Sequence, residues 1–287
     1  MEFEENLLQA LPEEEVNKLI ESLNDSDKHA VLLNTRFISD EDFVKLYPNV
    51  KPHPIVKHAF LYDKNEYQLG KSIYHELGYF YWQEPSAMVV SSLIDFSEDD
   101  FVLDMCGAPG GKTVQAAFRL NNKGTIISND LSRSRAEIIS NNVERLGLKN
   151  IIISNNDFEK IYTNFLNCFD KIILDAPCSG SGMFRKDDKM LNDWSINKVY
   201  KFAETQKRLI SIAYQMLKPG GTLSYSTCSY SIQENEEVIH LLMDTTDAEL
   251  MNMPKIGYVN QKDPIGTRLM PSIFPGEGQY ICLIKKP

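Results

Sequence analysis

The spacing of apolar residues in the first 75 residues predicts a small domain that mixes helix and strand. The segment LPEEEVNKLIESL, residues 11–23, repeats its apolar residues at helical spacing after a proline. AVLLN, at 30–34, is typical of a short strand, and SDEDFVKLY, at 39–47, predicts a capped helix that ends before a proline. We therefore expect residues 1–75 to form an N-terminal α/β domain.

Farther along the chain, apolar runs of strand length alternate with segments of helical periodicity. The predicted strands occupy residues 101–105, 125–129, 151–154, 171–177, 222–227 and 279–286, and the predicted helices occupy 113–120, 132–147, 195–217 and 233–243. Such alternation is typical of βαβ units, so we expect residues 76–287 to form an α/β domain with a doubly wound, mostly parallel sheet. Ligands of such sheets bind beyond the carboxyl ends of the strands.

Charge and overall composition narrow the class of protein. The net charge is -10 and the pI is near 5.1, which argues against a general nucleic-acid binder but allows a local basic face. No apolar run approaches the roughly 20 residues that cross a bilayer. The acidic start, MEFEENLLQALPEEE, is unlike a secretory or transit peptide. We expect a cytoplasmic protein without a membrane partner.

The cysteines and histidines do not predict a metal site. There are five cysteines, none in a C-x-x-C pair, and the five histidines have no ligand spacing. Cys168 and Cys282 lie in or beside apolar runs and are expected to be structural. In a reducing compartment, all five cysteines should be free thiols.

DMCGAPGGKT, residues 104–113, follows the first strand of the second domain and begins a helix. Its glycines let the backbone approach a ligand closely, and a helix N-terminus offers N–H groups that lack intrahelical partners. The P-loop of nucleoside triphosphatases needs G-x-x-x-x-G-K-[ST], and Cys106 stands where the first glycine would be. A nucleoside triphosphatase and a tight turn without a ligand are the alternative interpretations.

Acidic residues follow the next two strands. Asp130 stands about 20 residues after the glycine turn, where a carboxylate bonds a ribose hydroxyl in nucleoside-binding sheets. Asp157 follows the third strand and is placed to meet an adenine amino group. Three ligand-facing groups at three successive strand ends fit an adenosyl cofactor.

Two further segments, LDAPCSGSGMFRKD and YSTCSYS, each place a cysteine just after a strand-like run. A thiolate adds well to carbon 6 of a pyrimidine ring, whose carbon 5 is otherwise inert. Asp175 is placed to act as an acid near N3, where charge develops. After methyl transfer to carbon 5, a base must remove the carbon 5 proton so that the thiol can leave. Cys178 and Cys228 are the candidates for the two roles, and their residues alone do not decide which one attacks.

With these motifs, the chain resembles the RNA cytosine-5 methyltransferases of the Sun/RsmB/RsmF group. The resemblance extends from Leu32 to the end of the chain and rests on five segments in the family's order: GYFYWQEPSAM, DMCGAPGGKT, LDAPCSGSGMFRKD, YSTCSYSIQENEEVI and PGEGQYICLIKK. It implies a Rossmann-like class I fold, S-adenosyl-L-methionine as cofactor, and RNA as substrate.

The resemblance also implies a role for individual residues. Cys228 would be the nucleophile and Cys178 would assist product release, which is the reverse of the assignment in DNA cytosine-5 methyltransferases. The implied cofactor contacts are Cys106, Gly107, Ala108, Pro109, Gly110, Gly111, Lys112, Asp130, Asp157 and Asp175, the last of which also serves the base. Lys186 would support the active site, and Arg185 would meet an RNA phosphate.

The resemblance to the RsmF type favours 16S ribosomal RNA as the substrate, possibly within a ribosomal subunit. The alternatives are the same chemistry on transfer RNA, and a ribosome-assembly RNA-binding protein that has lost activity. The resemblance ends with the last strand, so we expect a short form without a C-terminal RNA-binding domain, and a monomer. RNA capture would then depend on residues 1–75 and on the catalytic face.

Overall fold

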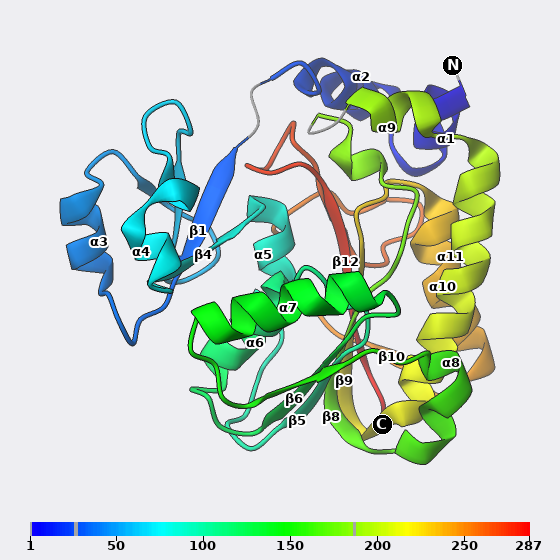
Figure 1. Cartoon of the computed structure of the whole chain (residues 1–287). Coiled ribbons are helices and arrows are strands. Elements are labelled where there is room, and N and C mark those ends of the chain that lie inside the picture. Colours follow the sequence, from blue (N-terminus) through cyan, green and yellow to red (C-terminus); the bar gives the residue numbers. More distant parts are fainter. Residues whose placement is uncertain (1, 26–27, 186–187) are drawn as a thin grey trace. The chain divides into compact units, whose positions relative to one another are not determined.

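The computed structural model describes residues 2–25, 28–185 and 188–287 of the chain. It contains two compact units (Figure 1). Unit 1 combines Met1–Asp27 with Phe158–Pro287, and unit 2 is Lys28–Asp157. Among the described residues, no helix has the length and apolar character needed to cross a membrane.

Unit 2 begins with a four-stranded antiparallel sheet in the order β2-β3-β1-β4. Its strands are β1 (His29–Leu33), β2 (Lys51–Pro52), β3 (Ala59–Tyr62) and β4 (Phe80–Gln83), with η1 (Leu69–Lys71) and the helices α3 (Asp40–Leu46) and α4 (Ile73–Glu76). Val31, Phe43, Phe60 and Phe80 form its core. The strand predicted at 30–34 and the helix predicted at 39–47 are confirmed, and Ser39 caps α3 by accepting from Asp42 N. The sequence patterns missed β3 and β4.

Unit 2 continues with three parallel strands in the order β5-β6-β7. These are β5 (Phe101–Asp104), β6 (Thr125–Asn129) and β7 (Ile151–Ser154), with the helices α5 (Pro85–Ser92), α6 (Gly111–Arg119) and α7 (Arg133–Arg145). All three strands were predicted. Ser132 is the N-cap residue of α7, but its side chain makes no capping hydrogen bond.

Unit 1 carries the strands β8 (Phe169–Asp175), β9 (Leu217–Thr227), β10 (Glu249–Leu250), β11 (Thr267–Leu269) and β12 (Gln279–Lys285). β8 and β9 are parallel, whereas β12 pairs with β9, β10 and β11 in antiparallel fashion. The helix predicted at 195–217 ends at Met216, directly before KPGG, and these residues lie inside β9, whose pairing with β8 begins at Leu217. Gly220 has φ 78°, so the two glycines mark an irregularity in the strand, where the register with β8 shifts.

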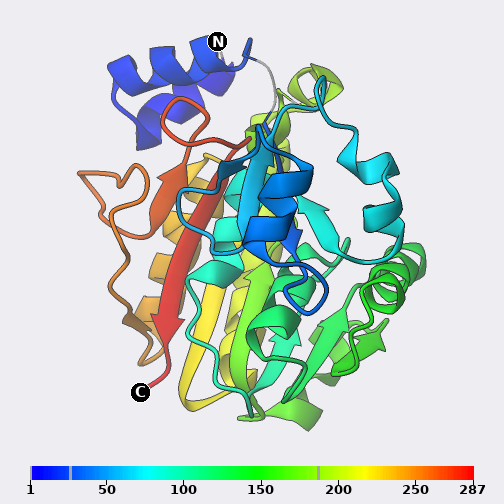
Figure 2. The ribbon, with the colours of Figure 1, turned by 90° about the vertical axis from the view of Figure 1, so that its left-hand side faces the viewer.

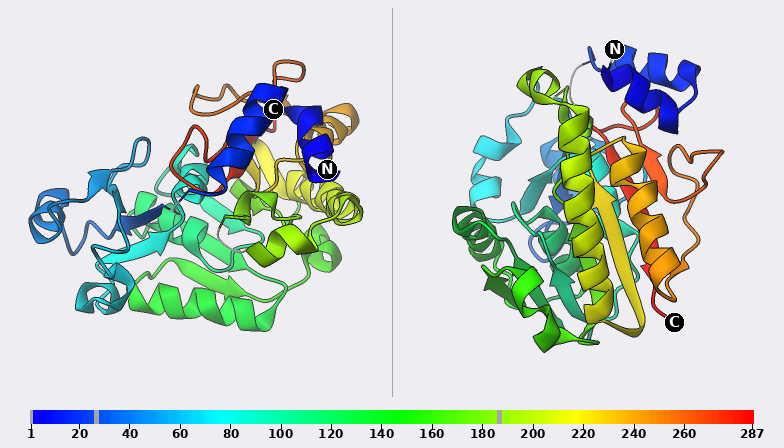
Figure 3. Two further views of the ribbon diagram at one scale, coloured as in Figure 1. Left: turned by 90° about the horizontal axis from the view of Figure 1, so that it is seen from above. Right: turned by 90° about the vertical axis from the view of Figure 1, so that its right-hand side faces the viewer.

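The helices of unit 1 cover its strands. They are α8 (Phe158–Ile161), α9 (Asp188–Asp193), α10 (Ile196–Met216) and α11 (Glu236–Thr245), with η2 (Tyr162–Phe165), η3 (Ser181–Met183) and η4 (Ile232–Glu234). Figure 3 shows α10 and α11 beside each other along β9. The two long helices were predicted, and α11 begins three residues later than the pattern indicated.

Two N-terminal helices, α1 (Glu2–Ala10) and α2 (Glu13–Ser22), also belong to unit 1. Leu7, Leu11 and Leu19 share a buried cluster with Tyr230 and Met270. Figure 2 shows the two helices, in blue, next to the segment that leads into β12. Periodicity predicted α2 but missed α1, although Leu7 is fully buried.

Candidate active site

The two cysteines that follow β8 and β9 lie side by side. β8 and β9 are parallel neighbours in which Asp175 pairs with Ser226, so Cys178 and Cys228 both follow strands that end at the same edge. Their Sγ atoms are 2.9 Å apart, and both cysteines are free and half-buried. The structure therefore brings together the two thiols that the sequence singled out.

The surroundings of Cys178 favour its neutral thiol. The hydrogen bond with Cys228, burial, and the charges of Cys228, Glu234 and Asp175 raise the pKa of Cys178 well above its usual value. Cys178 therefore keeps its proton at neutral pH and can donate it in a hydrogen bond to the sulfur of Cys228.

Asp175, the last residue of β8, is oriented by side chains of two other strands. Its Oδ1 accepts from Ser226 Oγ at 2.7 Å and from Gln279 Nε2 at 3.0 Å. Neither residue was predicted: Ser226 lies inside the YSTCSYS segment, where only the cysteine was singled out, and Gln279 is far away in the sequence. The available signal was Gln279 at the start of the apolar run of β12, whereas Ser226 is one of several polar residues in β9.

The backbone around Cys228 is held by buried polar groups. Asn235 Oδ1 accepts from Thr227 Oγ1 at 2.7 Å, and its Nδ2 donates to Ser229 O at 2.8 Å. Gly182 N donates to Cys228 O at 2.7 Å. A Cβ on Gly182 would come within 2.9 Å of that same carbonyl oxygen, so the close approach needs glycine.

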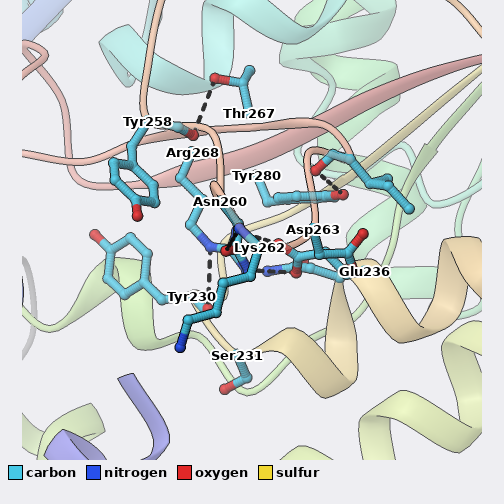
Figure 4. Close-up of polar contacts among 12 residues, drawn as sticks. Tyr230, Ser231, Glu236, Tyr258, Asn260, Lys262, Asp263, Thr267, Arg268 and Tyr280 are labelled. Atoms are coloured by element: carbon cyan, nitrogen blue, oxygen red, sulfur yellow. Dashed lines mark hydrogen bonds and ion pairs between the residues drawn. The ribbon is translucent and has the colours of Figure 1, made fainter. Parts of the chain in front are cut away.

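A buried arginine anchors the next part of this loop (Figure 4). Arg268 Nε donates to Tyr230 O at 3.2 Å, and the two terminal nitrogens bind the two carboxylate oxygens of Glu236 at 2.5 and 2.6 Å. The Arg268 guanidinium also lies 5.2 Å from the centroid of the Tyr280 ring. Removing either charge would leave the other buried and unpaired, which is costly. The ion pair therefore fixes the position of Arg268, which in turn holds the backbone at Tyr230.

The predicted cofactor turn, Cys106 to Lys112, joins β5 to α6 in unit 2. Gly107 N donates to Asn129 O at 2.6 Å, and Gly110, with φ 111°, is the N-cap residue of α6. A Cβ on Gly107 would come within 2.5 Å of Ser128 Oγ. The glycines thus bring the turn against β6 and leave the N-terminus of α6 at the edge where a ligand would bind.

Helix α7 holds the outer side of the same turn. Arg135 donates from NH2 to Ala108 O at 3.0 Å, and Asn142 Nδ2 donates to Pro109 O at 3.0 Å. The pattern of 132–147 predicted a helix but gave no sign of a role for these two residues. Their side chains lie on the surface of α7 that faces the turn.

The acidic residues predicted at the next two strand ends lie where expected. β6 and β7 are parallel neighbours, and Asp130 and Asp157 follow them. The buried Asp130 carboxylate accepts from Ser132 N at 2.9 Å and lies 3.4 Å from Arg135, whereas Asp157 is half-buried. Asn129 Nδ2 donates to Met105 O and Asn156 O, which ties the ends of the three parallel strands together.

Two basic residues after Cys178 have different outcomes. Lys186 lies outside the described residues, so its supporting role stays a prediction. Arg185 was expected to meet an RNA phosphate, and this is wrong. Its side chain is only 4% exposed, pairs with Glu277 at 3.0 Å and donates to Gly276 O at 2.6 Å, so the guanidinium is already neutralised and buried.

The other titratable groups do not suggest a second centre. Cys282 is buried on β12, and burial raises its pKa to about 12, as expected of a structural thiol. Within the part of the chain that the structure describes, no group of three or more His, Cys, Asp and Glu side chains could hold a metal ion.

Comparison with known proteins agrees with this geometry. Residues 91–285 match the family model described as 16S rRNA methyltransferase RsmB/F, and residues 1–85 match the N-terminal domain of 16S rRNA methyltransferase RsmF.

Two curated relatives are similar over most of the chain. Ribosomal RNA small subunit methyltransferase F of Vibrio atlanticus is 36% identical over 90% of this chain and 58% of that protein. The tRNA (cytosine(49)-C(5))-methyltransferase of Pyrococcus abyssi is 38% identical over 83% of this chain and 80% of that protein. The chain therefore spans less than two thirds of the length of the first relative.

Solved structures confirm the predicted fold class. A methyltransferase homologue from Pyrococcus horikoshii is 31% identical, with a TM-score of 0.84 over 99% of this chain and 94% of that one. NSun6 from the same organism, at 24% identity, superposes with a TM-score of 0.89 over 99% of this chain and 97% of that one. The fold is the Rossmann-like class I type with a small N-terminal domain, and the chain belongs to the RsmB/F family of S-adenosylmethionine-dependent methyltransferases.

Proposed function

We propose that this chain methylates carbon 5 of a cytosine in RNA through a covalent bond between Cys228 and carbon 6 of the base. The observation that carries the proposal is the pair of free thiols, 2.9 Å apart, at the ends of two parallel strands. Family membership supports the class of reaction. A binding protein without activity would have no chemical need for two adjacent thiols beside an oriented carboxylate.

In the first step, the Cys228 thiolate forms a bond to carbon 6, and the π electrons of the 5,6 double bond move into the ring. We assign to the carboxyl group of Asp175 the role of acid, donating its proton to N3 so that this charge is neutralised. Ser226 and Gln279 hold its carboxyl group in one orientation, which favours such a role. Cys178 keeps its proton at this stage and donates to the sulfur of Cys228.

In the release step, carbon 5 carries both the new methyl group and a proton. Removal of this proton re-forms the 5,6 double bond, breaks the S–C6 bond and returns Cys228 as a thiolate. We assign the removal to Cys178. The hydrogen bond with Cys228 is the largest cause of the raised pKa of Cys178, followed by burial and then by the charge of Cys228. When Cys228 is bonded to carbon 6, its charge is gone and its sulfur is a weaker acceptor, so the pKa of Cys178 falls from its raised value. Cys178 can then lose its proton to water and accept the one from carbon 5.

S-adenosylmethionine supplies the methyl group. We propose that the turn Cys106–Lys112 binds it, with Asp130 at the ribose and Asp157 near the adenine. Three features of unit 2 fit such a ligand: close backbone packing at Gly107, a helix that begins at Gly111, and an acidic residue after each of the next two strands.

For the substrate, we propose 16S ribosomal RNA, with residues 1–75 as an RNA-binding domain. The match of residues 1–85 to the RsmF N-terminal domain supports this choice. Transfer RNA is the second candidate, because the chain covers 80% of the Pyrococcus tRNA methyltransferase. Bisulfite sequencing after incubation with 16S RNA, small ribosomal subunits or transfer RNA would show which one gains 5-methylcytosine. No methylated cytosine in any of them would overturn the proposal.

The roles of the two thiols can be separated on a denaturing gel with labelled RNA and S-adenosylmethionine. Cys228→Ala should abolish methyl transfer and give no RNA adduct. Cys178→Ala should attack and methylate, then keep the RNA bound through Cys228, because only release needs the second thiol. An adduct with Cys228→Ala and none with Cys178→Ala would mean that the two roles are reversed.

A further inference from the structure

One buried carboxylate, that of Glu234, is shared by the two cysteine loops. Glu234 is fully buried in η4. Its Oε1 accepts from Ser179 N at 2.8 Å and from Gln206 Nε2 at 3.1 Å. Its Oε2 accepts from Ser179 Oγ and from Ser229 Oγ, both at 2.5 Å.

The partners of Glu234 are the direct neighbours of the two thiols. Ser179 follows Cys178, and Ser229 follows Cys228. A single oxygen atom, Oε2, therefore joins the residue after one cysteine to the residue after the other. Both loops can move apart only if a buried carboxylate loses hydrogen bonds, which is costly.

Within the loops, Ser181 Oγ accepts from Tyr230 N at 3.0 Å, and Gly182 N donates to Cys228 O. Of the polar side chains outside the two loops, Gln206 and Asn235 each hold one loop only. Gln206 Nε2 donates to Pro177 O at 2.8 Å, before Cys178. Asn235 bonds Thr227 and Ser229, on either side of Cys228. Glu234 differs from both because its carboxylate reaches the two loops at once.

We infer that Glu234 is a positioning residue that sets the distance between Cys178 and Cys228. The importance of this role for catalysis rests on the proposed function, whereas the hydrogen bonds that define the role do not depend on it. Burying a carboxylate is unfavourable, and burial raises the pKa of Glu234 against the hydrogen bonds that lower it. A role in joining the two cysteine loops accounts for a buried carboxylate at position 234.

The chemistry of the four contacts separates position from charge. At Oε1 both partners are N–H groups, which can only donate a hydrogen bond and cannot accept one. At Oε2 both donors are hydroxyl groups, which can rotate and accept instead. Glutamine can therefore place its oxygen at the first position and its amide nitrogen at the second. Glu234→Gln should keep the hydrogen bonds to both cysteine loops without the negative charge. Glu234→Ala removes these hydrogen bonds altogether.

The test measures the distance between the thiols without RNA or cofactor. Diamide oxidises two adjacent thiols to a disulfide: the thiols lose two protons and two electrons, and diamide becomes the corresponding hydrazine. Peptide mass mapping of the full chain quantifies the Cys178–Cys228 product over time. We expect Glu234→Ala to slow its formation about tenfold or more, and Glu234→Gln to stay within about threefold of the wild type.

Matched variants control for lost stability. Leu242→Ala removes a fully buried apolar side chain from α11 that cannot hydrogen-bond to either cysteine loop, so its oxidation rate should equal that of the wild type. If Glu234→Ala does not fold, the double variant Ser179→Ala, Ser229→Ala removes the two hydroxyl donors and should also slow the reaction. The inference would be overturned if Glu234→Ala, or the double variant tested in its place, formed the disulfide at the wild-type rate. It would also be overturned if Glu234→Gln slowed the reaction as much as Glu234→Ala does.

Methyl transfer then connects position with activity. Glu234→Ala should lower kcat about 100-fold with little change in KM for RNA, and Glu234→Gln should restore most of it. A wild type that methylates no RNA, with slow oxidation in Glu234→Ala, would refute the proposed function and keep the positioning role. If the wild type methylates RNA and Glu234→Ala forms the disulfide as fast as the wild type, the proposed function stands and the positioning role is refuted.

Discussion

The glycine turn of unit 2 and the cysteine loops of unit 1 reach defined conformations by different means. The turn is set largely by its backbone: Gly107 packs against β6, and Gly110 has a positive φ that starts α6. The cysteine loops are set by buried side chains, above all Glu234 and Asn235, which come from later in the chain.

This difference predicts how each region responds to mutation. A turn set by its own backbone depends mainly on its glycines and on the few side chains that contact it. A loop set by buried polar side chains depends on residues that a local motif does not contain, and each loss leaves a buried partner without its hydrogen bond.

The largest effect should come from Gly182→Ala. The new Cβ would lie within 2.9 Å of the backbone oxygen of Cys228 and 2.8 Å of that of Gly278, so the Cys228 loop must shift. A shift of about 1 Å lowers methyl transfer about 100-fold. Affinity for S-adenosylmethionine, measured by calorimetry, should not change. Gly70→Ala is the control, because its Cβ would meet nothing within 4 Å. Normal turnover by Gly182→Ala would show that the loop tolerates displacement.

Asp130→Ala should affect cofactor binding in unit 2 and leave the cysteine loops of unit 1 unchanged. Loss of a hydrogen-bonded carboxylate should weaken S-adenosylmethionine binding by about 1–3 kcal/mol. Calorimetry measures this loss directly, and the diamide reaction of Cys178 with Cys228 should keep its wild-type rate. Unchanged cofactor affinity would remove Asp130 from the binding site.

Asn142→Ala should have a smaller effect on the turn. It removes the hydrogen bond from α7 to Pro109 O, which stabilises the turn by about 0.5–1.5 kcal/mol. Cofactor affinity should fall by a few-fold at most. Asn141→Ala, on the exposed side of the same helix, is the control. An equal effect of both variants would indicate a change in the helix rather than in the turn.

The smallest effect is a pH dependence of stability from Glu234. Because burial raises its pKa above the unfolded value of 4.5, the folded protein binds more protons than the unfolded chain in the interval between the two pKa values. Its contribution to the free energy of unfolding is therefore full below pH 4.5 and decreases as the pH rises through the folded pKa.

Urea unfolding of the wild type and of Glu234→Gln across this range measures the effect. The stability of the wild type relative to the variant should decrease as the pH rises, because glutamine does not titrate. A difference that is independent of pH would mean that Glu234 has the same pKa in both states.

Much of the fold and of the site was predictable from local patterns. The alternation of apolar strands with periodic helices predicted β5 to β9, α7 and α10, and the glycine turn was recognisable from ten residues. Within each unit one rule was enough, since carboxyl ends of neighbouring parallel strands share an edge: Asp130 and Asp157 follow β6 and β7 in unit 2, and Asp175 and the two cysteines lie at the ends of β8 and β9 in unit 1.

What the sequence by itself determined is thus the set of chemical groups and the strand ends that carry them. Only the tertiary structure decided that Cys178 and Cys228 are 2.9 Å apart, that Glu234 joins their loops, and that Arg185 is buried against Glu277. The physical reason is that strand order and register bring these groups together across dozens of residues. A hydrogen bond depends on distance and angle to within a few tenths of an ångström, and no local pattern encodes that geometry.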